Sequence, residues 1–233
     1  MRHALYFTPP ADHPLVLAAE RWLGRSVFPR DVPAETIGGV TPDERETLTA
    51  DPRRYGFHGT LKAPFRLVPQ AMPADLHAAL EAFGAERAAA PAVRLRVSSL
   101  GGFLALTPAA PAPGLDALAG DVVRRFEPFR AALSDGEIAR RNPESLTDAQ
   151  RENLEKWGYP YVFAAFRFHM TLTGRLNDAE AARLLPILEA HFAEALAEPV
   201  DLDRVALFEE PERGRPFTCI RLERLTGAAP DNQ

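Results

Sequence analysis

Cysteine is almost absent from this sequence, which contains a single residue of that type, Cys219. One cysteine cannot form an intramolecular disulfide, and it cannot build a cysteine-rich zinc site. This composition is typical of a protein from a reducing compartment. We therefore predict that Cys219 is an ordinary strand residue and not a nucleophile.

Long apolar runs are also missing. No segment approaches the roughly 20 consecutive apolar residues that a membrane-spanning helix requires. The first residues, MRHALYFTPPADHP, contain no apolar stretch of signal-peptide length. The sequence therefore predicts a cytoplasmic protein that does not cross a membrane.

An excess of positive charge is lacking as well. The chain has 27 lysines and arginines against 32 aspartates and glutamates, which gives a net charge of −5. Proteins that follow a long nucleic acid usually neutralise many phosphates with a basic surface. We therefore expect a small-molecule partner and regard RNA as a less favoured one, although a local basic pocket is compatible with this charge. The composition does not indicate an oligomeric state.

Two familiar catalytic motifs are absent, namely the glycine-rich phosphate loop and the serine nucleophile elbow. What the sequence does contain is a pentapeptide pattern that occurs twice. Residues 57–61 read FHGTL and residues 168–172 read FHMTL, in a chain with only six histidines. The shared context of these two histidines predicts one active site built from two halves.

The segments that follow the two motifs occur in the same order. After the first motif we predict a helix over 74–88 and a hairpin of strands at 93–100 and 103–108; after the second, a helix over 178–196 and strands at 203–208 and 217–222. The two histidines are 111 residues apart, and this offset also aligns the helices and hairpins. Such agreement is typical of a diverged internal duplication.

Helix boundaries are marked by capping signals. Thr41, Thr147 and Asn177 are each followed three residues later by Glu or Gln, which is the pattern of a capping box. Pro14 is placed in the first turn of a helix that should end before Gly24. Pro186 predicts either a bend in the last helix or a later start of that helix.

The predicted fold class is α+β, with two lobes related by a pseudo-two-fold axis, antiparallel sheets lining a central cleft and helices on the outside. The expected divisions are a first lobe (1–128), an inserted helical segment that could act as a lid (129–166), a second lobe (167–225) and a tail (226–233). All of these belong to one compact bilobal domain.

Strand alternation places the polar residues of each motif on one face. Across both motifs these residues are His58, Thr60, Lys62, Arg167, His169 and Thr171. Opening a phosphodiester without a metal needs a base, an acid and donors for the charge on the phosphate oxygens. One neutral and one charged imidazole supply the base and the acid. The pattern therefore predicts a phosphoryl-transfer site with two catalytic histidines, with no metal and no cofactor.

Each of these residues also has an ordinary structural explanation. A single histidine is more often structural than catalytic, the threonines suit a strand by propensity alone, and Lys62 and Arg167 are explained equally well as solvated charges. A zinc site is the weaker hypothesis, because neither histidine has a partner at ligand spacing. Tyr55, Tyr159 and Tyr161 could stack on a base or donate to a phosphate, although core or rim packing explains them equally well.

The paired motifs HGTL and HMTL resemble the signature of the two-histidine (2H) phosphoesterase superfamily, which includes cyclic nucleotide phosphodiesterases and RNA 2′,3′-cyclic phosphodiesterases of the LigT type. Further segments resemble one branch, named for phosphonate metabolism and found with carbon–phosphorus lyase genes: YFTPPADHPL, WLGR, YGFHGTLKAPF, RFEPFRAAL, LTDAQRENLEKWGYPYVF and FRFHMTLTGRL. The resemblance extends from about residue 3 to residue 225. The superfamily usually has a hydrophobic residue after each histidine; Met170 fits this pattern and Gly59 departs from it.

This resemblance implies a bilobal α+β fold and metal-independent opening of a cyclic phosphodiester. It implies that His58 and His169 are the acid and base pair, and that Thr60 and Thr171 contact phosphate oxygens. Which histidine is the acid stays open. Two histidines with the ordinary pKa of about 6.5 predict a bell-shaped dependence of activity on pH.

We therefore predict a hydrolase that opens a cyclic phosphodiester of a small sugar phosphate or nucleotide, with a link to phosphonate metabolism. One alternative is an RNA 2′,3′-cyclic phosphodiesterase, in which arginines such as Arg140 and Arg141 guide a strand. Another is a phosphate-ligand sensor or accessory protein without catalytic activity.

Overall fold

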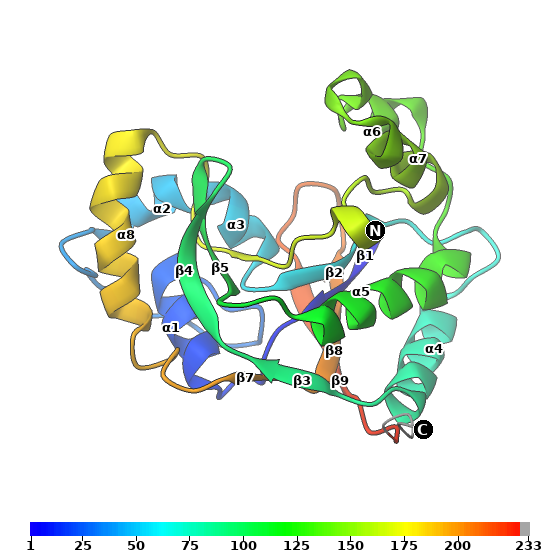
Figure 1. Cartoon of the computed structure of the whole chain (residues 1–233), viewed down its shortest axis with the longest axis horizontal. Helices are drawn as coiled ribbons and strands as arrows, with labels where there is room; N and C mark the ends of the chain where they lie inside the picture. Colours follow the sequence, from blue (N-terminus) through cyan, green and yellow to red (C-terminus); the bar gives the residue numbers. More distant parts are fainter. Residues whose placement is uncertain (229–233) are drawn as a thin grey trace.

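The structure, a computed structural model, describes residues 1–228 (Figure 1). The helices are α1 (Pro14–Leu23), α2 (Pro42–Leu48), α3 (Ala50–Tyr55), α4 (Pro73–Glu86), α5 (Pro113–Phe126), α6 (Asp135–Ala139), α7 (Asp148–Trp157) and α8 (Asp178–Phe192), with 3₁₀ turns η1 (Glu127–Phe129), η2 (Pro143–Ser145) and η3 (Phe163–Ala165). The strands are β1 (Arg2–Phe7), β2 (Gly59–Phe65), β3 (Ala90–Val93), β4 (Leu95–Leu100), β5 (Phe103–Pro108), β6 (Met170–Thr171), β7 (Val200–Leu202), β8 (Arg204–Glu210) and β9 (Thr218–Arg224).

The capping residues predicted from the sequence begin helices α2, α7 and α8. The side chains of Thr41, Thr147 and Asn177 each accept a hydrogen bond from the backbone N–H three residues later. Gly24 ends α1 in the left-handed conformation, as predicted. Pro186 lies inside α8, so the alternative of a later helix start is wrong, and α8 ends at Phe192 rather than at residue 196.

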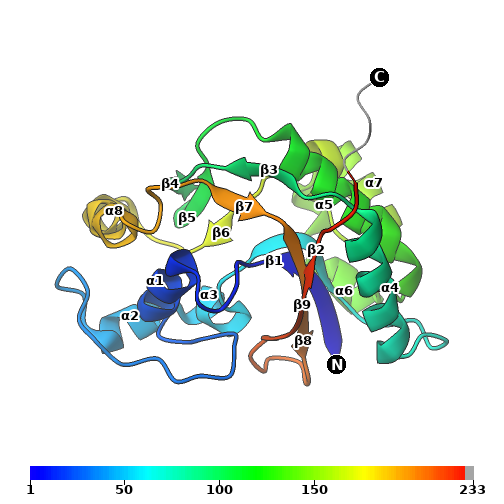
Figure 2. The same cartoon turned by 90° about the horizontal axis from the view of Figure 1, so that it is seen from below.

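A seven-stranded antiparallel sheet forms the centre of the molecule, with the strand order β4-β5-β6-β2-β1-β8-β9. At its middle, β2 pairs with β6, so the strands that follow His58 and His169 are direct neighbours. Gly59 pairs with Met170 there. A second, two-stranded ribbon joins β3 to β7, and Figure 2 shows these strands side by side. The α+β class with antiparallel sheets is thus confirmed.

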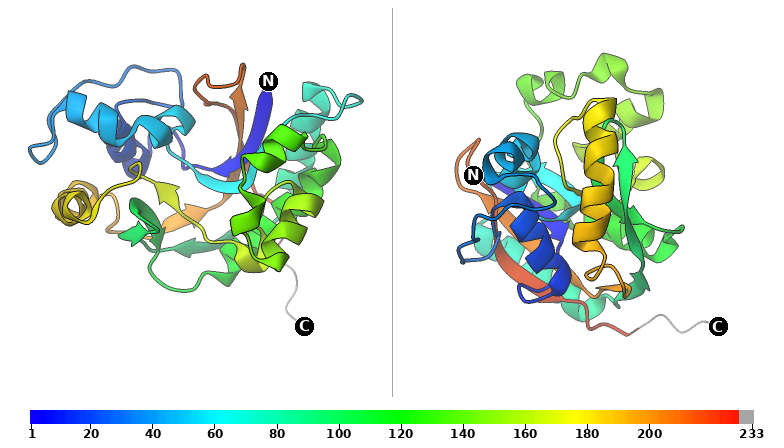
Figure 3. Two further views of the ribbon diagram at one scale, coloured as in Figure 1. Left: turned by 90° about the horizontal axis from the view of Figure 1, so that it is seen from above. Right: turned by 90° about the vertical axis from the view of Figure 1, so that its left-hand side faces the viewer.

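The two predicted lobes share this one sheet. Strand β5 comes from the expected first lobe and pairs with β6 of the expected second lobe, so the division at residue 128 does not separate two sheets. The hairpins β4–β5 and β8–β9 both form. Helix α8 packs on β4 and β5, whereas α4 packs on β8 and β9. Each helix therefore covers the hairpin of the opposite half, and Figure 3 shows the helices on either side of the strands.

The inserted segment carries helices α6 and α7, which project from the sheet above α4 and α5 (Figure 1). In the predicted tail, the backbone N–H groups of Thr226 and Gly227 donate to carbonyls at the end of α4. The tail residues 229–233 lie outside the described residues. None of the described helices combines the length and apolar character that a membrane span requires.

Candidate active site

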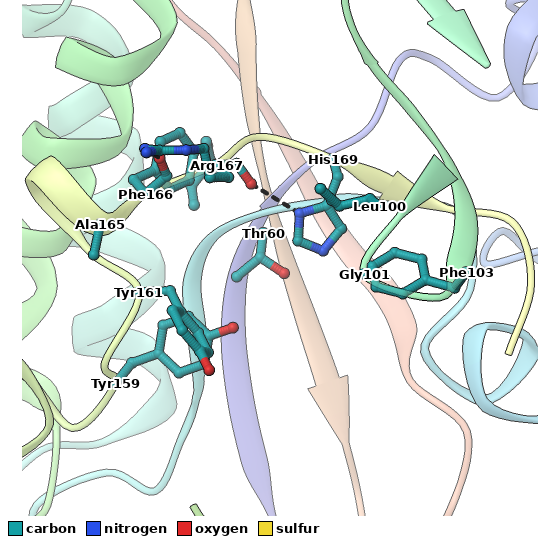
Figure 4. Close-up of a pocket in the computed structure, with 11 residues that line it drawn as sticks. Thr60, Leu100, Gly101, Phe103, Tyr159, Tyr161, Ala165, Phe166, Arg167 and His169 are labelled. Carbon is teal, nitrogen blue, oxygen red and sulfur yellow. Dashed lines mark hydrogen bonds between the residues drawn. The ribbon is translucent and has the colours of Figure 1, made fainter. Parts of the chain in front are cut away.

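A cavity of about 430 Å³ opens beside β2 and β6 (Figure 4). We call it the histidine cavity, and its lining residues are Thr60, Leu61, Leu100, Gly101, Phe103, Tyr159, Tyr161, Ala165, Phe166, Arg167 and His169. They come from the first motif, the hairpin β4–β5, the inserted segment and the second motif. The structure therefore brings parts of both motifs to one place.

Both histidines are held in the same way. In His58, Nδ1 lies 2.9 Å from the carbonyl oxygen of Gly56, and in His169, Nδ1 lies 2.8 Å from the carbonyl oxygen of Arg167. In each case the acceptor is the residue two positions earlier. Because a carbonyl can only accept, each Nδ1 carries the proton and donates it. In the neutral ring this leaves the lone pair on Nε2, the atom available for proton transfer.

Gly56 can hold His58 in this way because of its backbone conformation. It has φ +76° and ψ 178°, a region that only glycine adopts readily. A Cβ at this position would also lie within 1.9 Å of the Val27 side chain. The glycine before the first motif therefore directs its carbonyl toward the imidazole.

The strand register places the two motifs side by side and in opposite directions. Because Gly59 pairs with Met170 in an antiparallel ladder, extending the register by one residue sets His58 opposite Thr171 and Thr60 opposite His169. Side chains opposite each other in such a ladder share a face. In addition, the hydroxyl of Thr60 lies 3.3 Å from Nε2 of His58 and can donate to it. Thr171 is half-buried and does not line the histidine cavity.

The surroundings of the two histidines differ. The ring of buried Tyr6 stacks on His58 with a centroid separation of 3.8 Å, and Phe208 lies 6.1 Å away. Burial lowers the pKa of His58 to about 4, the hydrogen bond to Gly56 opposes this shift, and charge on His169 adds to it. His58 is therefore neutral at pH 7. His169 has Phe103 beside it, at 5.7 Å, and lines the open cavity.

Gly59 departs from the hydrophobic pattern for a steric reason. A Cβ on Gly59 would lie 2.3 Å from the ring of Phe168. That ring, from the second motif, occupies the space that a side chain at position 59 would need. The first motif is thus packed by a residue of the second motif.

Lys62 does not take the position that strand alternation predicted. Tyr6 pairs with Thr60 but Leu5 pairs with Lys62, so the register shifts by one residue between them. This bulge-like shift turns Lys62 away from the face of Thr60 and into the core. Its ammonium lies 2.6 Å from a carboxylate oxygen of Glu127, and it does not line the histidine cavity.

The other predicted contact residues are near the site. Arg167 lines the histidine cavity, and its Nη1 donates to the carbonyls of Ala164 and Phe166. Tyr161 lines the same cavity, and Figure 4 shows it beside Tyr159. The ring of Tyr55 is 6.1 Å from that of His58, but Tyr55 lines a different cavity.

Sequence reasoning missed Tyr6 and Phe103, which lie against the histidines. A compositional signal was present, because all four tyrosines of the chain gather around the two motifs: Tyr6, Tyr55, Tyr159 and Tyr161. Cys219 lies on β9, as predicted, and burial raises the pKa of its thiol to about 12. Within residues 1–228, no three His, Cys, Asp or Glu side chains gather as they would around a metal ion.

Among the solved structures that resemble this chain, two cover nearly its whole length. One is LigT of E. coli complexed with NADP+, with a TM-score of 0.40, 13% identity and coverage of 97% of each chain. The other is TT0787 of Thermus thermophilus, with a TM-score of 0.41, 17% identity and coverage of 98% of this chain and 100% of that one.

Two curated proteins are similar in sequence, and both are named ribose 1,5-bisphosphate phosphokinase PhnN. The protein from Janthinobacterium sp. (strain Marseille) is 41% identical over 93% of this chain and 49% of its own length. The protein from Laribacter hongkongensis (strain HLHK9) is 35% identical over 95% of this chain and 51% of its own length. The chain thus spans about half the length of these relatives.

The family match covers the region that contains most of the site. It extends over residues 60–218, from Thr60 through the second motif to the start of β9. This is more than half of the chain. The chain therefore belongs to the family described as "Protein of unknown function (DUF1045)".

Proposed function

We propose that this chain is a metal-independent 2H phosphoesterase that hydrolyses a cyclic phosphodiester of a small sugar phosphate or nucleotide. One observation carries the proposal. Two histidines directly before adjacent central strands are each held through Nδ1 by the carbonyl two residues earlier, which leaves both Nε2 atoms for proton transfer. Identical tethering of two imidazoles suits a reaction that needs a base and an acid in one site.

The difference between the histidines supports an assignment of roles. His58 has a pKa lowered to about 4 and is neutral at pH 7, so its Nε2 accepts a proton from the attacking water. The water oxygen forms a bond to phosphorus while the bond from phosphorus to the departing sugar oxygen breaks. His169, in its charged form, gives its Nε2 proton to that oxygen. The products are one phosphate monoester and one free hydroxyl group.

Other residues supply donors for the charge on the phosphate oxygens. In this proposal the hydroxyls of Thr60 and Thr171 contact two non-bridging oxygens, since the register sets each beside a histidine. Arg167 stays anchored by Nη1 on two backbone carbonyls and offers its remaining N–H groups to the phosphate. No step requires a metal ion.

The lining of the histidine cavity favours a small substrate with a flat or sugar-like body. Phe103, Tyr159 and Tyr161 provide rings that can pack on a ribose or a base. The names of the two curated relatives support a phosphorylated ribose, because they refer to ribose 1,5-bisphosphate. A role in phosphonate metabolism, which the sequence resemblance implies, remains part of this proposal.

A phosphokinase is the second candidate, because both curated relatives carry that name. The chain spans about half of their length. Its sequence contains no glycine-rich phosphate loop, the element with which P-loop kinases hold ATP. We therefore assign the named kinase activity of the relatives to the half that this chain does not match.

Phosphorus NMR in the presence of EDTA tests the proposal. The panel contains ribose cyclic phosphates, 2′,3′-cyclic nucleotides, a short RNA with a cyclic end, and ATP with ribose 1,5-bisphosphate. We expect a small cyclic phosphate to open to one monoester, and we expect His58→Ala and His169→Ala each to lower kcat by about 10²–10⁴-fold. His77→Ala, on α4, is the matched histidine control and should keep the wild-type rate.

Other results would overturn parts of the proposal. Activity that disappears with EDTA and returns with a divalent metal contradicts the two-histidine mechanism. If ATP and ribose 1,5-bisphosphate are the only panel members that react, the result supports the kinase. If the cyclic end of the RNA is the only group that opens, the result supports the RNA phosphodiesterase. Binding of panel members without any turnover supports the sensor.

A further inference from the structure

A second cavity, of about 440 Å³, is rich in arginine. We call it the arginine cavity, and its lining residues are Arg2, Arg54, Tyr55, Pro64, Leu133, Glu137, Arg140, Arg141, Arg213 and Gly214. They come from β1, α3, β2, the inserted segment and the loop between β8 and β9. Five separate parts of the chain thus form a cavity that is lined by five arginines, in a protein whose net charge is −5.

The acidic residues near this cavity are already engaged. Glu137 pairs with Arg66 at 3.1 Å and also accepts from the backbone of Ser134. Fully buried Glu210 accepts hydrogen bonds from Arg2, Arg54 and the backbone of Gly214. Positive charge in the cavity therefore exceeds negative charge.

Three of the arginines lack an acidic partner. Within the part of the chain that the structure describes, no carboxylate lies within 4.0 Å of the guanidinium groups of Arg140, Arg141 or Arg213. Arginine side chains with free donors in a concave site suit a phosphate group, because the guanidinium fork matches its oxygens. The chemistry of this cavity is that of an anion site.

Arg2 and Arg54 are held in place by neighbouring side chains. Both donate hydrogen bonds to the carboxylate of Glu210, and the guanidinium of Arg54 also lies 4.3 Å from the ring centroid of Tyr55. Arg54 donates to the hydroxyl of Tyr55 as well. A preorganised donor loses little conformational entropy when a ligand binds.

The arginine cavity lies next to the histidines. Tyr55 lines it, and the ring of Tyr55 is 6.1 Å from the ring of His58. The guanidinium of Arg141 lies 5.0 Å from the ring centroid of Tyr159, which lines the histidine cavity. Tyr55 and Tyr159 thus connect residues of the candidate active site with the lining of the arginine cavity. A ligand that contacts both sites would pass along these two rings.

We propose that the arginine cavity binds a phosphate monoester carried by the same small substrate whose cyclic phosphodiester lies between His58 and His169. This inference rests on the proposed function and narrows its substrate to a sugar that bears two phosphorus groups. A terminal monoester has up to two negative charges and three free oxygens, so it can use several arginines at once. The partners it would meet first are Arg140, Arg141 and Arg213.

A monoester suits the cavity better than a polynucleotide does. A phosphodiester in a strand carries one charge, and its chain must leave the cavity on the other side. Here Pro64 and Leu133 contribute apolar wall, and the net charge of −5 gives a longer polyanion no further attraction. The bound ligand is therefore expected to end in this cavity.

The first test compares two substrates, a ribose cyclic phosphate with and without a 5-phosphate. We expect the wild type to prefer the 5-phosphorylated compound in kcat/KM by at least about tenfold, from one or two charge-assisted contacts. Arg141→Ala and Arg213→Ala should each reduce this ratio by about tenfold. Arg215→Ala is the matched control, because Arg215 is exposed on the same loop but does not line the cavity, and it should leave the ratio unchanged.

The second test is independent of catalysis. Ribose 5-phosphate, titrated by calorimetry, should bind the wild type, His58→Ala and Arg215→Ala alike, and should bind Arg141→Ala and Arg213→Ala at least about tenfold more weakly. If no cyclic phosphate turns over but this binding pattern holds, the proposed function fails and the anion site stands. If ribose 5-phosphate does not bind, or binds all variants equally, the inference is wrong. A dinucleotide with a cyclic end that binds more tightly than the 5-phosphorylated ribose compound would also overturn it in favour of RNA.

Discussion

Single residues make the two histidines chemically different. In the sheet, Tyr6 pairs with Thr60 and Ala105 pairs with Thr171, so these two residues occupy matching places beside the two motifs. The ring of Tyr6 covers His58, whereas the methyl side chain of Ala105 cannot stack on His169. Both imidazoles are half-buried, but only His58 has a ring stacked on it from this matching position.

Replacing Tyr6 should change the protonation of His58. In Tyr6→Leu, water reaches the imidazole, so its charged form is penalised less and its pKa should rise from about 4 toward the ordinary value of about 6.5. At pH 5 more of the base would then carry a proton, and activity at that pH should fall relative to activity at pH 7.5. Proton NMR of the His58 ring across a pH titration measures the shift.

Tyr6→Phe is the matched control for this change. It keeps the stacked ring and removes only the hydroxyl, so the midpoint of His58 should stay near 4. An unchanged midpoint in Tyr6→Leu would show that the ring does not control His58.

Gly59 shows how a departure from a sequence pattern can have a packing explanation. The sequence marks this position only as a missing hydrophobic residue. The ring of Phe168, which is distant in sequence, explains the glycine by occupying its side-chain space. Such a contact cannot be predicted without knowing that β2 and β6 are neighbours.

Gly59→Ala should be destabilising. A methyl group 2.3 Å from the Phe168 ring forces that ring to move, at a cost of about 1–3 kcal/mol in the free energy of unfolding. Activity should fall too, because Phe168 directly precedes His169. Urea denaturation and kcat measure the two effects.

A second variant separates this clash from a general intolerance of substitution. Adding Phe168→Leu to Gly59→Ala removes the ring edge and should recover part of the lost stability. Gly174→Ala, whose new Cβ would meet its nearest atom at 3.5 Å, should be close to neutral. If Gly59→Ala is as stable as wild type, the packing explanation is wrong.

Among the elements, those with local signals were predicted well. The capped starts of α2, α7 and α8 depend on residues three positions apart, and these were predicted correctly. The strand of the second motif was overestimated, because β6 contains only Met170 and Thr171. Alternation in a sequence indicates which side chains share a face, but ladder pairing depends on distant neighbours.

Lys62 connects β2 to η1 through an ion pair and to α5 through a hydrogen bond, and the sequence predicted neither contact. Lys62 lies 2.6 Å from a carboxylate oxygen of Glu127 and 3.3 Å from the carbonyl of Val123. Burial lowers the pKa of Lys62, while Glu127 opposes this shift. The register shift at β1 that directs Lys62 inward depends on a pairing of two strands, which no local pattern reveals.

Removing Glu127 should weaken this connection. In Glu127→Ala the buried ammonium loses its partner, which should cost about 3 kcal/mol of unfolding free energy. The double variant Lys62→Met with Glu127→Ala should recover most of that loss, because no unpaired charge remains. Chemical denaturation of the single and double variants measures the coupling.

The same cycle tests whether Lys62 contacts the substrate. If the role of Lys62 is structural, Lys62→Met should leave KM within about twofold of wild type. The reason is that the Lys62 ammonium contacts Glu127 and does not line the histidine cavity. A tenfold or larger rise in KM would return Lys62 to the phosphate-binding set predicted from the sequence.

For the whole molecule, the duplication that the repeated motif suggested stays a prediction. From the centre outward, the strands are β6, β5 and β4 on one side and β2, β1, β8 and β9 on the other. Gly59 and Met170, which are 111 residues apart like the histidines, pair at the centre. The two hairpins that the offset relates, β4–β5 and β8–β9, therefore lie at opposite ends of one sheet.

The position of β5 in the sheet differs from the one that the sequence offset suggested. The offset of 111 matched β5 with β9, but in the sheet β5 holds the place that β1 holds in the other half. The sequence predicted a repeat from its motifs and helices, but the position of β5 in the sheet follows from long-range pairing alone.

The arginine cavity was even less accessible to sequence reasoning. Arg140 and Arg141 drew attention as a basic pair, but Arg2, Arg54 and Arg213 come from segments far apart in the chain. Their convergence depends on the packing of the inserted segment against the sheet. Charge counted along the chain therefore cannot reveal such a site.

The dependence of kcat/KM on pH, for wild type and both histidine variants, tests the central claim most directly. Activity should rise through an acidic limb near pH 4, lower than the sequence predicted, because His58 must be neutral to accept a proton. The residual activity of His58→Ala should lack this acidic limb, whereas that of His169→Ala should keep it. Retention of the acidic limb in His58→Ala would contradict the role of His58 as the base.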